Sequence, residues 1–166
     1  MDNIYLCGFM GAGKTTVAKA LAKKNGVSYC DTDDLITTLC GLSIPEIFSR
    51  YGEAYFREME TKALRETQSL PGAVIATGGG LVLNPKNVEL IREYGTLLYL
   101  DTPFSLCYER IHGDQNRPNA AARTKDELFA LYREREAVYR KASCLIIPCG
   151  NDLEETLRRI EQVLNK

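Results

Sequence analysis

Five short apolar runs alternate with longer segments of helical periodicity along the chain. The runs cover residues 4–7, 27–30, 73–76, 97–100 and 144–147. Each run is too short for a helix, is rich in β-forming residues and is bounded by Gly, Pro or Asp, so each predicts a buried strand. Because the runs are almost continuously apolar rather than alternating, they favour a parallel sheet covered on both faces. Strands and helices in alternation then indicate an α/β doubly wound fold.

Four pairs of residues carry signals that start helices. In two pairs, Glu follows Ser or Thr after three residues, a capping box in which side chains satisfy the first backbone N–H groups. In the other two, a cap residue precedes a proline suited to the first helical turn. The pairs are Ser43 with Glu46, Thr124 with Glu127, Asn84 with Pro85, and Thr102 with Pro103. Gly26 and Gly95 occupy positions typical of glycines that end helices.

A polar segment at residues 112–123 interrupts this order, between two helical patterns. It has no apolar stripe, and a loop of this length in a compact domain is typically functional. Arg117 and Arg123 within it favour a lid that closes over an anion. Because no linker or internal repeat is present, we expect a single domain over residues 1–166, with the lid at about residues 112–124.

Charge and composition restrict the partners. The 166 residues include 21 Lys and Arg and 22 Asp and Glu, which gives a formal net charge of -1. This balance provides no overall attraction to nucleic acid or to an anionic membrane. No apolar run approaches the roughly 20 residues that span a bilayer, and the N-terminus has no signal-peptide pattern. We therefore expect a soluble cytoplasmic monomer that binds neither nucleic acid nor membrane.

The six cysteines contain no C-x-x-C pair, and His112 has no cysteine nearby. This spacing does not support a zinc site. Cytosolic proteins rarely keep disulfides, so we expect all six cysteines to be reduced.

The sequence GFMGAGKT at residues 8–15 matches the phosphate-binding pattern G-x-x-x-x-G-K-[ST]. It directly follows the first predicted strand and opens a helix, as this phosphate-binding loop (P-loop) requires. Backbone N–H groups of such a loop converge on phosphate oxygens, and the helix N-terminus adds partial positive charge. Lys14 is expected to bridge the β- and γ-phosphates, and the Thr15 hydroxyl to ligate Mg²⁺. The motif predicts a nucleoside triphosphate site at Gly11, Ala12, Gly13, Lys14, Thr15 and Thr16.

Aspartates at the ends of two predicted strands compete for the catalytic role. Asp31, Asp33 and Asp34 follow the second strand, at the sheet edge where ligands bind in open α/β folds. Two aspartates spaced i, i+2 suit a division of labour, with one facing a metal and one facing an acceptor hydroxyl. Asp101 follows the fourth strand, but Thr102 and Pro103 come next, so we interpret Asp101 as closing the strand and beginning the next helix.

Taken in order along the chain, these motifs resemble the shikimate kinase family. The resemblance covers essentially the whole chain. It rests on the P-loop, Asp31-Thr32-Asp33, Phe56-Arg57 with Glu60, the glycines 78–80, Arg117-Pro118, and Arg135 with Tyr139. It implies a P-loop NTPase-type three-layer fold, with a five-stranded parallel sheet flanked by helices and a mobile lid, as in nucleoside monophosphate kinases. It also implies transfer of the ATP γ-phosphate to the 3-hydroxyl of shikimate, on the route to chorismate and the aromatic amino acids.

The resemblance also assigns the acceptor residues. Asp33 would hold the acceptor hydroxyl, Arg57 and Arg135 would clamp the shikimate carboxylate, and the backbone of Gly78, Gly79 and Gly80 would pack against the ring. Arginine forks suit this task because they bind carboxylates through bidentate, charge-assisted hydrogen bonds. From the residues alone, Arg57 could instead form an i, i+3 helix pair with Glu60, and Arg135 could be solvated in a charged run.

On the nucleotide side, the resemblance places Asp31 near Mg²⁺ through water and Arg110 against adenine, near the loop that begins at Cys149. Lys14, Asp33 and Arg117 would be catalytic, with Arg117 reaching the phosphates from the lid. The chain departs from the family at residues 119–122, where Asn and three Ala replace bulky aliphatic residues. The departure affects the packing of the lid, and Arg123 could compete with Arg117.

Two other functions remain open from the motifs. Another small-metabolite kinase, such as a gluconate kinase, would use the same P-loop but would not need paired carboxylate-binding arginines with three glycines. A catalytically idle nucleotide-binding module would not need Lys14, Thr15, Asp31 and Asp33 together.

Overall fold

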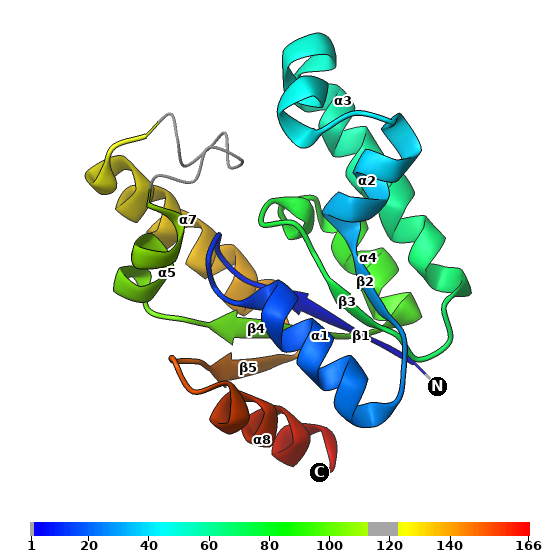
Figure 1. Ribbon diagram of the computed structural model, residues 1–166, viewed down its shortest axis with the longest axis vertical. Coiled ribbons are helices and arrows are strands. Elements are labelled where there is room, and N and C mark those ends of the chain that lie inside the picture. The colour runs from blue at the N-terminus through cyan, green and yellow to red at the C-terminus, as the bar shows by residue number, and fades with distance from the viewer. Residues whose placement is uncertain (1, 113–122) are drawn as a thin grey trace.

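The computed structural model describes residues 2–112 and 123–166. Five parallel strands form a sheet in the order β2-β3-β1-β4-β5 (Figure 1). They are β1 (Asn3–Cys7), β2 (Tyr29–Asp31), β3 (Val74–Ala76), β4 (Gly95–Asp101) and β5 (Leu145–Pro148). Each apolar run that predicted a strand overlaps one of them, so the five-stranded parallel sheet is confirmed.

The helices connect these strands in the order that the sequence predicts. They are α1 (Lys14–Asn25), α2 (Thr32–Cys40), α3 (Ile44–Glu66), α4 (Pro85–Tyr94), α5 (Phe104–Ile111), α7 (Lys125–Ala142) and α8 (Leu153–Leu164), with the short 3-10 helices η1 (Thr67–Ser69) and η2 (Leu81–Leu83). Helix α3 bends at Gly52, where φ is 85° and ψ is 176°. No helix in this described part has the length and apolar character needed to cross a membrane.

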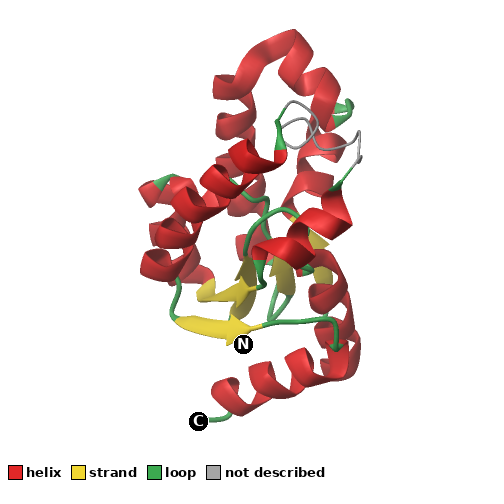
Figure 2. Ribbon diagram, turned by 90° about the vertical axis from the view of Figure 1, so that its left-hand side faces the viewer, coloured by secondary structure: helices red, strands yellow, loops and turns green. Residues whose placement is uncertain are grey.

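Alternate strand residues face two helical layers. On one face, Leu6 and Leu98 pack with Leu21 of α1 and Leu157 of α8. On the other face, the core that includes Tyr99 is covered by side chains of α4, α5 and α7. Figure 2 shows the helices on both sides of the strands. This arrangement is the three-layer α/β fold.

Helices α2 and α3 form a small core of their own beyond the sheet edge (Figure 1). Ile36 and Ile47 are fully buried there, together with Phe56, Met59 and Ala63. Because Asp33 and Arg57 belong to these two helices, this core fixes how both side chains reach the site.

Three of the four predicted helix starts are confirmed. Ser43 and Thr124 accept hydrogen bonds from the backbone N–H groups three residues later, and Asn84 accepts from Lys86 N. The fourth is wrong: α5 begins at Phe104, after Pro103. The Thr102 hydroxyl instead donates to Ala12 O at 2.8 Å, a buried bond to the P-loop that occupies the group expected to cap the helix.

The expected helix ends and cysteine states are confirmed. Gly26 ends α1 in the left-handed conformation, and the N–H of Gly95 closes α4 on Ile91 O. All six cysteines lie in the described residues and are free.

Candidate active site

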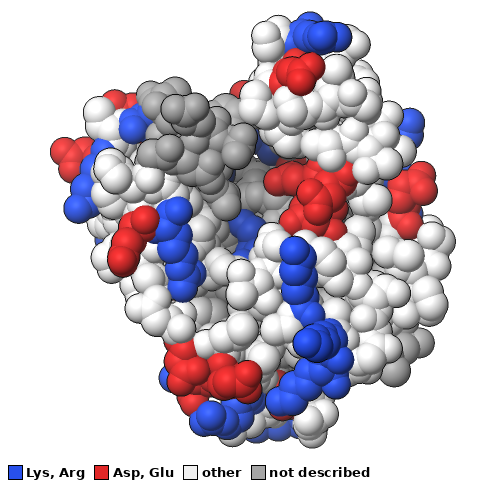
Figure 3. Space-filling model, in the orientation of Figure 1, with Lys and Arg blue, Asp and Glu red and all other residues white. Residues whose placement is uncertain are grey.

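A cleft of about 600 Å³ lies at the carboxyl ends of the strands. Figure 3 shows a hollow on this side, with acidic side chains gathered on the wall next to α2. The predicted site residues within the described part all line the cleft, namely Gly11, Ala12, Gly13, Lys14, Thr15, Thr16, Asp31, Asp33, Arg57, Gly78, Gly79, Gly80, Arg110 and Arg135. Arg117 and most of the predicted lid lie outside the described residues.

The P-loop forms a cradle between β1 and α1. Gly11 has a φ of 77°, and a Cβ there would lie only 2.7 Å from Cys107 O, so the loop needs glycine at this position. Lys14 Nζ folds back and donates to Gly8 O at 2.6 Å and to Phe9 O at 3.3 Å. The first turn of α1 has no acidic residue to offset the positive end of the helix dipole. The cradle therefore suits an anion such as a phosphate group.

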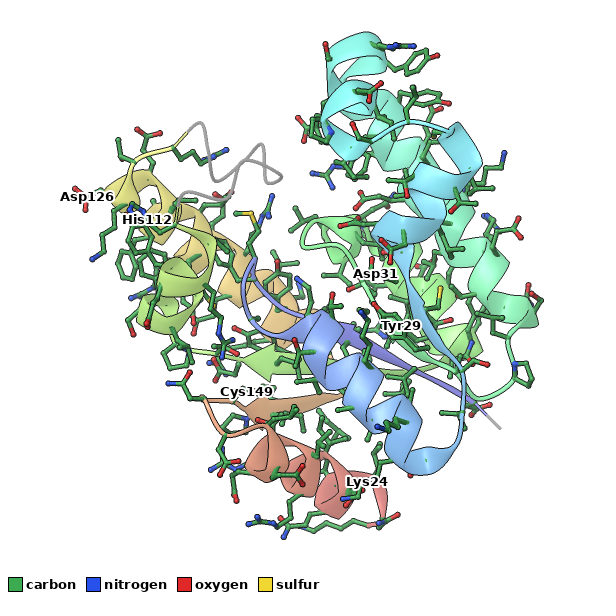
Figure 4. The ribbon with its side chains drawn as sticks, in the orientation of Figure 1. Lys24, Tyr29, Asp31, His112, Asp126 and Cys149 are labelled. Carbon is green, nitrogen blue, oxygen red and sulfur yellow. The ribbon has the colours of Figure 1, made fainter. Side chains whose placement is uncertain are left out.

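The two residues predicted to hold a metal lie next to each other. Thr15 Oγ1 donates to Asp31 Oδ2 at 3.1 Å. The other oxygen, Oδ1, accepts from the backbone N–H of Asp33 at 2.8 Å and caps α2. Figure 4 labels Tyr29, the first residue of β2, and Asp31, its last, and the Tyr29 hydroxyl lies 3.5 Å from Asp31 Oδ2.

This pair fits Mg²⁺, which takes oxygen ligands and uses one or two protein groups beside substrate phosphates and water. Within residues 2–112 and 123–166, no group of three or more His, Cys, Asp or Glu side chains could hold a metal without such help. The oxygens of Thr15 and Asp31 are therefore the groups that could hold Mg²⁺ at the P-loop.

The glycine loop, defined as Gly78, Gly79 and Gly80, lies against the first turn of α2. A Cβ on Gly78 would lie 2.7 Å from Asp33 Oδ1, so this approach excludes any side chain. The fully buried Thr32 hydroxyl accepts a hydrogen bond from Gly78 N at 3.0 Å. Thr32 has a positioning function that the sequence analysis missed, although it is part of the Asp-Thr-Asp motif.

Arg57 is held in the cleft by two acidic residues of its own helix. Its Nη1 donates to Glu60 Oε1 at 2.6 Å, and its Nη2 donates to Glu53 Oε1 at 3.4 Å. The i, i+3 pair with Glu60 thus exists, and a Cβ on Gly80 would clash with the same guanidinium. Arg57 therefore pairs with Glu60 and lines the cleft at the same time.

Glu60 is an additional charged group of the site that the sequence analysis treated only as a partner of Arg57. Its side chain is 1% exposed, and it lines the cleft. Burial raises the pKa of Glu60 to about 7, and Asp33 adds to this effect, while Arg57 and Arg135 oppose it. A carboxyl group that changes protonation near neutral pH therefore lies inside the cleft, beside Arg57.

Arg135 is buried, with 7% of its surface exposed, so the interpretation as a solvated residue is wrong. Its neighbours Arg133 and Glu134 are exposed. The amino-acid sequence alone does not show which residue of this charged run is buried. A Cβ on Gly79 would lie 3.5 Å from Arg135 Nη1. Helix α7 therefore carries Arg135 to the glycine loop at Gly79, while Arg57 contacts the loop at Gly80.

Arg110 connects the P-loop to a second loop. Its Nη1 donates to Gly11 O at 2.9 Å, and its Nη2 lies 3.4 Å from Gly150 O. The second loop follows β5 at Cys149, which Figure 4 labels.

Asp101, the competing acid, closes β4 and pairs with Arg140 at 2.7 Å. The expectation that Asp101 closes the strand is confirmed, but the expectation that it begins the next helix is wrong, because α5 begins after Pro103.

Comparison with known proteins agrees with this geometry over the whole chain. The family model described as shikimate kinase matches residues 10–165. Shikimate kinases from Geobacter sulfurreducens and Synechococcus elongatus are 42% and 43% identical, covering 95% and 98% of this chain and 88% and 86% of their own lengths.

Solved structures give the same result. Shikimate kinase from Acinetobacter baumannii in complex with shikimate superposes with a TM-score of 0.91 at 36% identity, covering 99% of this chain and 93% of that one. The APS kinase CysC from Mycobacterium tuberculosis, at 17% identity and a TM-score of 0.63, shares the fold alone; the match covers 99% of this chain and 98% of that one. The family match and the full-length relatives show that this chain belongs to the shikimate kinase family.

Proposed function

We propose that this chain transfers the γ-phosphate of ATP to the 3-hydroxyl of shikimate, producing ADP and shikimate 3-phosphate. One observation carries the proposal: a single cleft joins the P-loop to a pocket walled by Arg57, Arg135 and the glycine loop. A small anion with several hydroxyl groups suits this pocket because arginine forks bind carboxylates. The A. baumannii relative was solved with shikimate bound, which supports the same acceptor here.

In this proposal the triphosphate lies along residues 11–16, and adenine lies beside Arg110. Lys14 Nζ exchanges the carbonyl oxygens of Gly8 and Phe9 for oxygens of the β- and γ-phosphates. Because these carbonyls already hold the ammonium group at the cradle, its charge needs little rearrangement as the phosphoryl group transfers.

Thr15 and Asp31 are the residues that we assign to Mg²⁺. When bound, Mg²⁺ supplies positive charge that offsets the charge of the β- and γ-phosphates. The Thr15 hydroxyl can turn its proton away from Asp31 Oδ2 and present a lone pair. Asp31 Oδ1 remains bonded to the first turn of α2, so the same aspartate fixes the start of the helix that carries Asp33.

At the acceptor end, Arg57 and Arg135 hold the carboxylate while the glycine loop supports the ring. Asp33 accepts a hydrogen bond from the 3-hydroxyl and takes its proton as the oxygen attacks the γ-phosphorus. A new oxygen–phosphorus bond forms, and the bond to the oxygen shared with the β-phosphate breaks. The arginines contribute by orienting the hydroxyl in line with the leaving group.

We assign the remaining catalytic role to Arg117, in the lid expected at about residues 112–124. In this proposal Arg117 reaches the transferring phosphate when the lid closes, and closure excludes water. The Asn and three Ala residues at 119–122 leave this lid with small side chains, which affects closure rather than chemistry.

ADP release, measured by a coupled assay with shikimate, gluconate or a nucleoside monophosphate as acceptor, tests the proposal. We expect turnover that depends on shikimate and on Mg²⁺. Turnover with gluconate equal to that with shikimate would favour the other metabolite kinase, and ADP release independent of any acceptor would favour an idle module. Since every assigned residue belongs to one chain, we propose that a monomer is active, and turnover per chain should not vary with enzyme concentration.

A further inference from the structure

Helix α7 carries two tyrosines whose hydroxyl groups donate to backbone carbonyls, one at Thr102 next to the P-loop and one in the glycine loop. Tyr132 and Tyr139 lie seven residues apart and therefore share one face of the helix. They are 7% and 1% exposed. Tyr132 donates to Thr102 O at 2.8 Å, and Tyr139 donates to Gly79 O. A buried tyrosine hydroxyl normally has a hydrogen-bond partner, so the bonds themselves are expected. The two tyrosines differ in which carbonyl each one binds.

Tyr132 serves the nucleotide end. Thr102, whose carbonyl accepts this bond, donates a hydrogen bond from its own hydroxyl to Ala12 O in the P-loop, at 2.8 Å. The Tyr132 ring also meets Phe9 of the P-loop edge-on, with 5.2 Å between ring centroids. This tyrosine therefore supports the P-loop from α7.

Tyr139 serves the acceptor end. Its hydroxyl contacts the carbonyl at the centre of the glycine loop, and a Cβ on Gly79 would be 3.5 Å from Arg135 Nη1 and 3.7 Å from this hydroxyl. Burial raises the pKa of Tyr139 well above its ordinary value, while the guanidinium of Arg135 beside it lowers the pKa. The hydroxyl therefore stays protonated and remains a donor.

The glycine loop needs such external support because it has no side chains of its own, and glycine has the greatest backbone freedom. At its far end, Asn87 Nδ2 donates to Leu81 O at 2.9 Å, and Asn87 Oδ1 accepts from Thr61 Oγ1 of α3 at 2.8 Å. Asn87 is 1% exposed. The loop is thus attached on one side to α7 and on the other to α3 and α4.

We propose that Tyr139 is a positioning residue for the acceptor half of the reaction, because its hydroxyl fixes the Gly79 carbonyl and Arg135 in one arrangement. The inference rests on the proposed function, which assigns Gly79 and Arg135 to shikimate. It assigns no direct contact between Tyr139 and substrate. Tyr139 acts through the backbone of the loop and through the neighbouring guanidinium.

Tyr139→Phe and Tyr132→Phe form a matched pair for the test, since each removes one oxygen from the same helix and keeps the ring. We expect Tyr139→Phe to raise the shikimate KM about tenfold and the ATP KM less than about twofold, because a buried carbonyl loses its donor. Tyr132→Phe should leave the shikimate KM within about twofold and raise the ATP KM instead. Hydrogen exchange at the amides of Gly79 and Gly80 should accelerate in Tyr139→Phe alone.

An unchanged shikimate KM in Tyr139→Phe, or an equal rise in Tyr132→Phe, would overturn the inference. Arg135→Ala, measured by calorimetric titration with shikimate, separates the two proposals. Normal binding by Arg135→Ala contradicts the proposed acceptor assignment and the Tyr139 role with it. Lost binding by Arg135→Ala together with a normal KM in Tyr139→Phe contradicts the Tyr139 role alone.

If Tyr139→Phe does not fold, a second pair of variants tests whether the attachments of the glycine loop position the acceptor. Asn87→Ala releases the glycine loop at Leu81, whereas Asn3→Ala removes a buried asparagine whose Nδ2 donates to Thr67 O at 2.9 Å, away from the cleft. Both should lower the melting temperature, and Asn87→Ala alone should raise the shikimate KM. Equal KM values in the two variants would overturn the view that the attachments of this loop position the acceptor.

Discussion

Arg57 Nη1 lies 2.6 Å from Oε1 of Glu60, a carboxylate that is almost completely buried in the cleft. The second oxygen, Oε2, has no hydrogen-bond partner among the described residues. The arginine that we assign to the substrate carboxylate is thus already bonded to a carboxylate of the protein. In the proposed function, substrate binding adds a second negative group beside Glu60. The buried carboxyl of Glu60 therefore has one consequence for the stability of the protein with pH and one for substrate binding.

The first consequence concerns stability. Burial raises the pKa of Glu60 from 4.5 to about 7, so the folded protein binds this proton more tightly than the unfolded chain. The contribution of Glu60 to stability is therefore fully present below pH 4.5 and is lost as the pH rises through about 7. We expect Glu60→Gln to flatten this part of the pH dependence, as measured by urea unfolding between about pH 4 and about pH 8. An identical pH profile in the variant would contradict the raised pKa.

The second consequence concerns binding. A shikimate carboxylate placed beside Glu60 favours the protonated form of Glu60, so binding near pH 7 should take up protons. Calorimetric titrations in buffers with different ionisation enthalpies measure this uptake. Glu60→Gln should remove it, and Glu53→Gln should not, because Glu53 also contacts Arg57 but is 70% exposed. Proton release on binding would contradict the prediction.

Lys14→Ala tests the P-loop. Removing the charge that follows the phosphoryl group should lower kcat by on the order of a hundredfold or more and leave the fold intact. Lys23→Ala, at an exposed position of the same helix, is the control and should behave as the parent protein. Steady-state kinetics with thermal unfolding of both variants provides the measurement. Near-normal turnover in Lys14→Ala would refute the assignment.

Asp33→Asn and Asp101→Asn separate the two aspartate candidates. Asp33→Asn keeps the shape but cannot take the proton of the acceptor hydroxyl, so kcat should fall sharply. Asp101→Asn weakens the pair with Arg140, a partly exposed ion pair, and should cost about 1 kcal/mol or less of stability with little change in kcat. The opposite pattern in assays of both variants would exchange the roles of the two residues.

Arg57→Ala and Arg117→Ala should fail in different ways. Arg57 is proposed to hold a carboxylate whose charge does not change during the reaction, so its loss should chiefly raise the shikimate KM. Arg117 is proposed to meet the phosphates on closure, so its loss should lower kcat strongly while shikimate binding without nucleotide stays unchanged. Calorimetric titration of the nucleotide-free variants distinguishes them. Equal losses of shikimate affinity would contradict the separation.

The strands and the P-loop could be predicted from the sequence because their signals are local. A buried parallel strand is apolar at nearly every position, and the glycine spacing in residues 8–15 follows from the turn itself. The start of α5 was predicted wrongly because the Thr102 hydroxyl finds its partner at Ala12, far away along the chain. A capping pattern includes only residues that are close in sequence, so it cannot show that a distant carbonyl binds the Thr102 hydroxyl instead.

The same reason limits the prediction of the site. Arg135 lies in a charged run that resembles a solvated helix face, and its burial depends on how α7 packs against the glycine loop. The pKa of Glu60 is raised chiefly by burial, and it is further raised by Asp33 and lowered by Arg135, which belong to two other helices. Residue types and motif order could name these groups, but only the packing of α2, α3 and α7 brings their charges together.

The pairing of β1 with β3 sets the distance between the points at which two loops of the cleft begin. Leu6 of β1 and Ala76 of β3 are paired in adjacent strands, and the P-loop follows one strand while the glycine loop follows the other. Adjacent strands lie about 4.8 Å apart because backbone hydrogen bonds fix that spacing. In the proposed function, the phosphate donor and the acceptor are therefore held by loops that follow neighbouring strands, whose spacing is set by backbone hydrogen bonds rather than by side chains. Substitutions in helices α2, α3 and α7 can move the side chains of the site, but the two strands from which the loops begin keep this spacing.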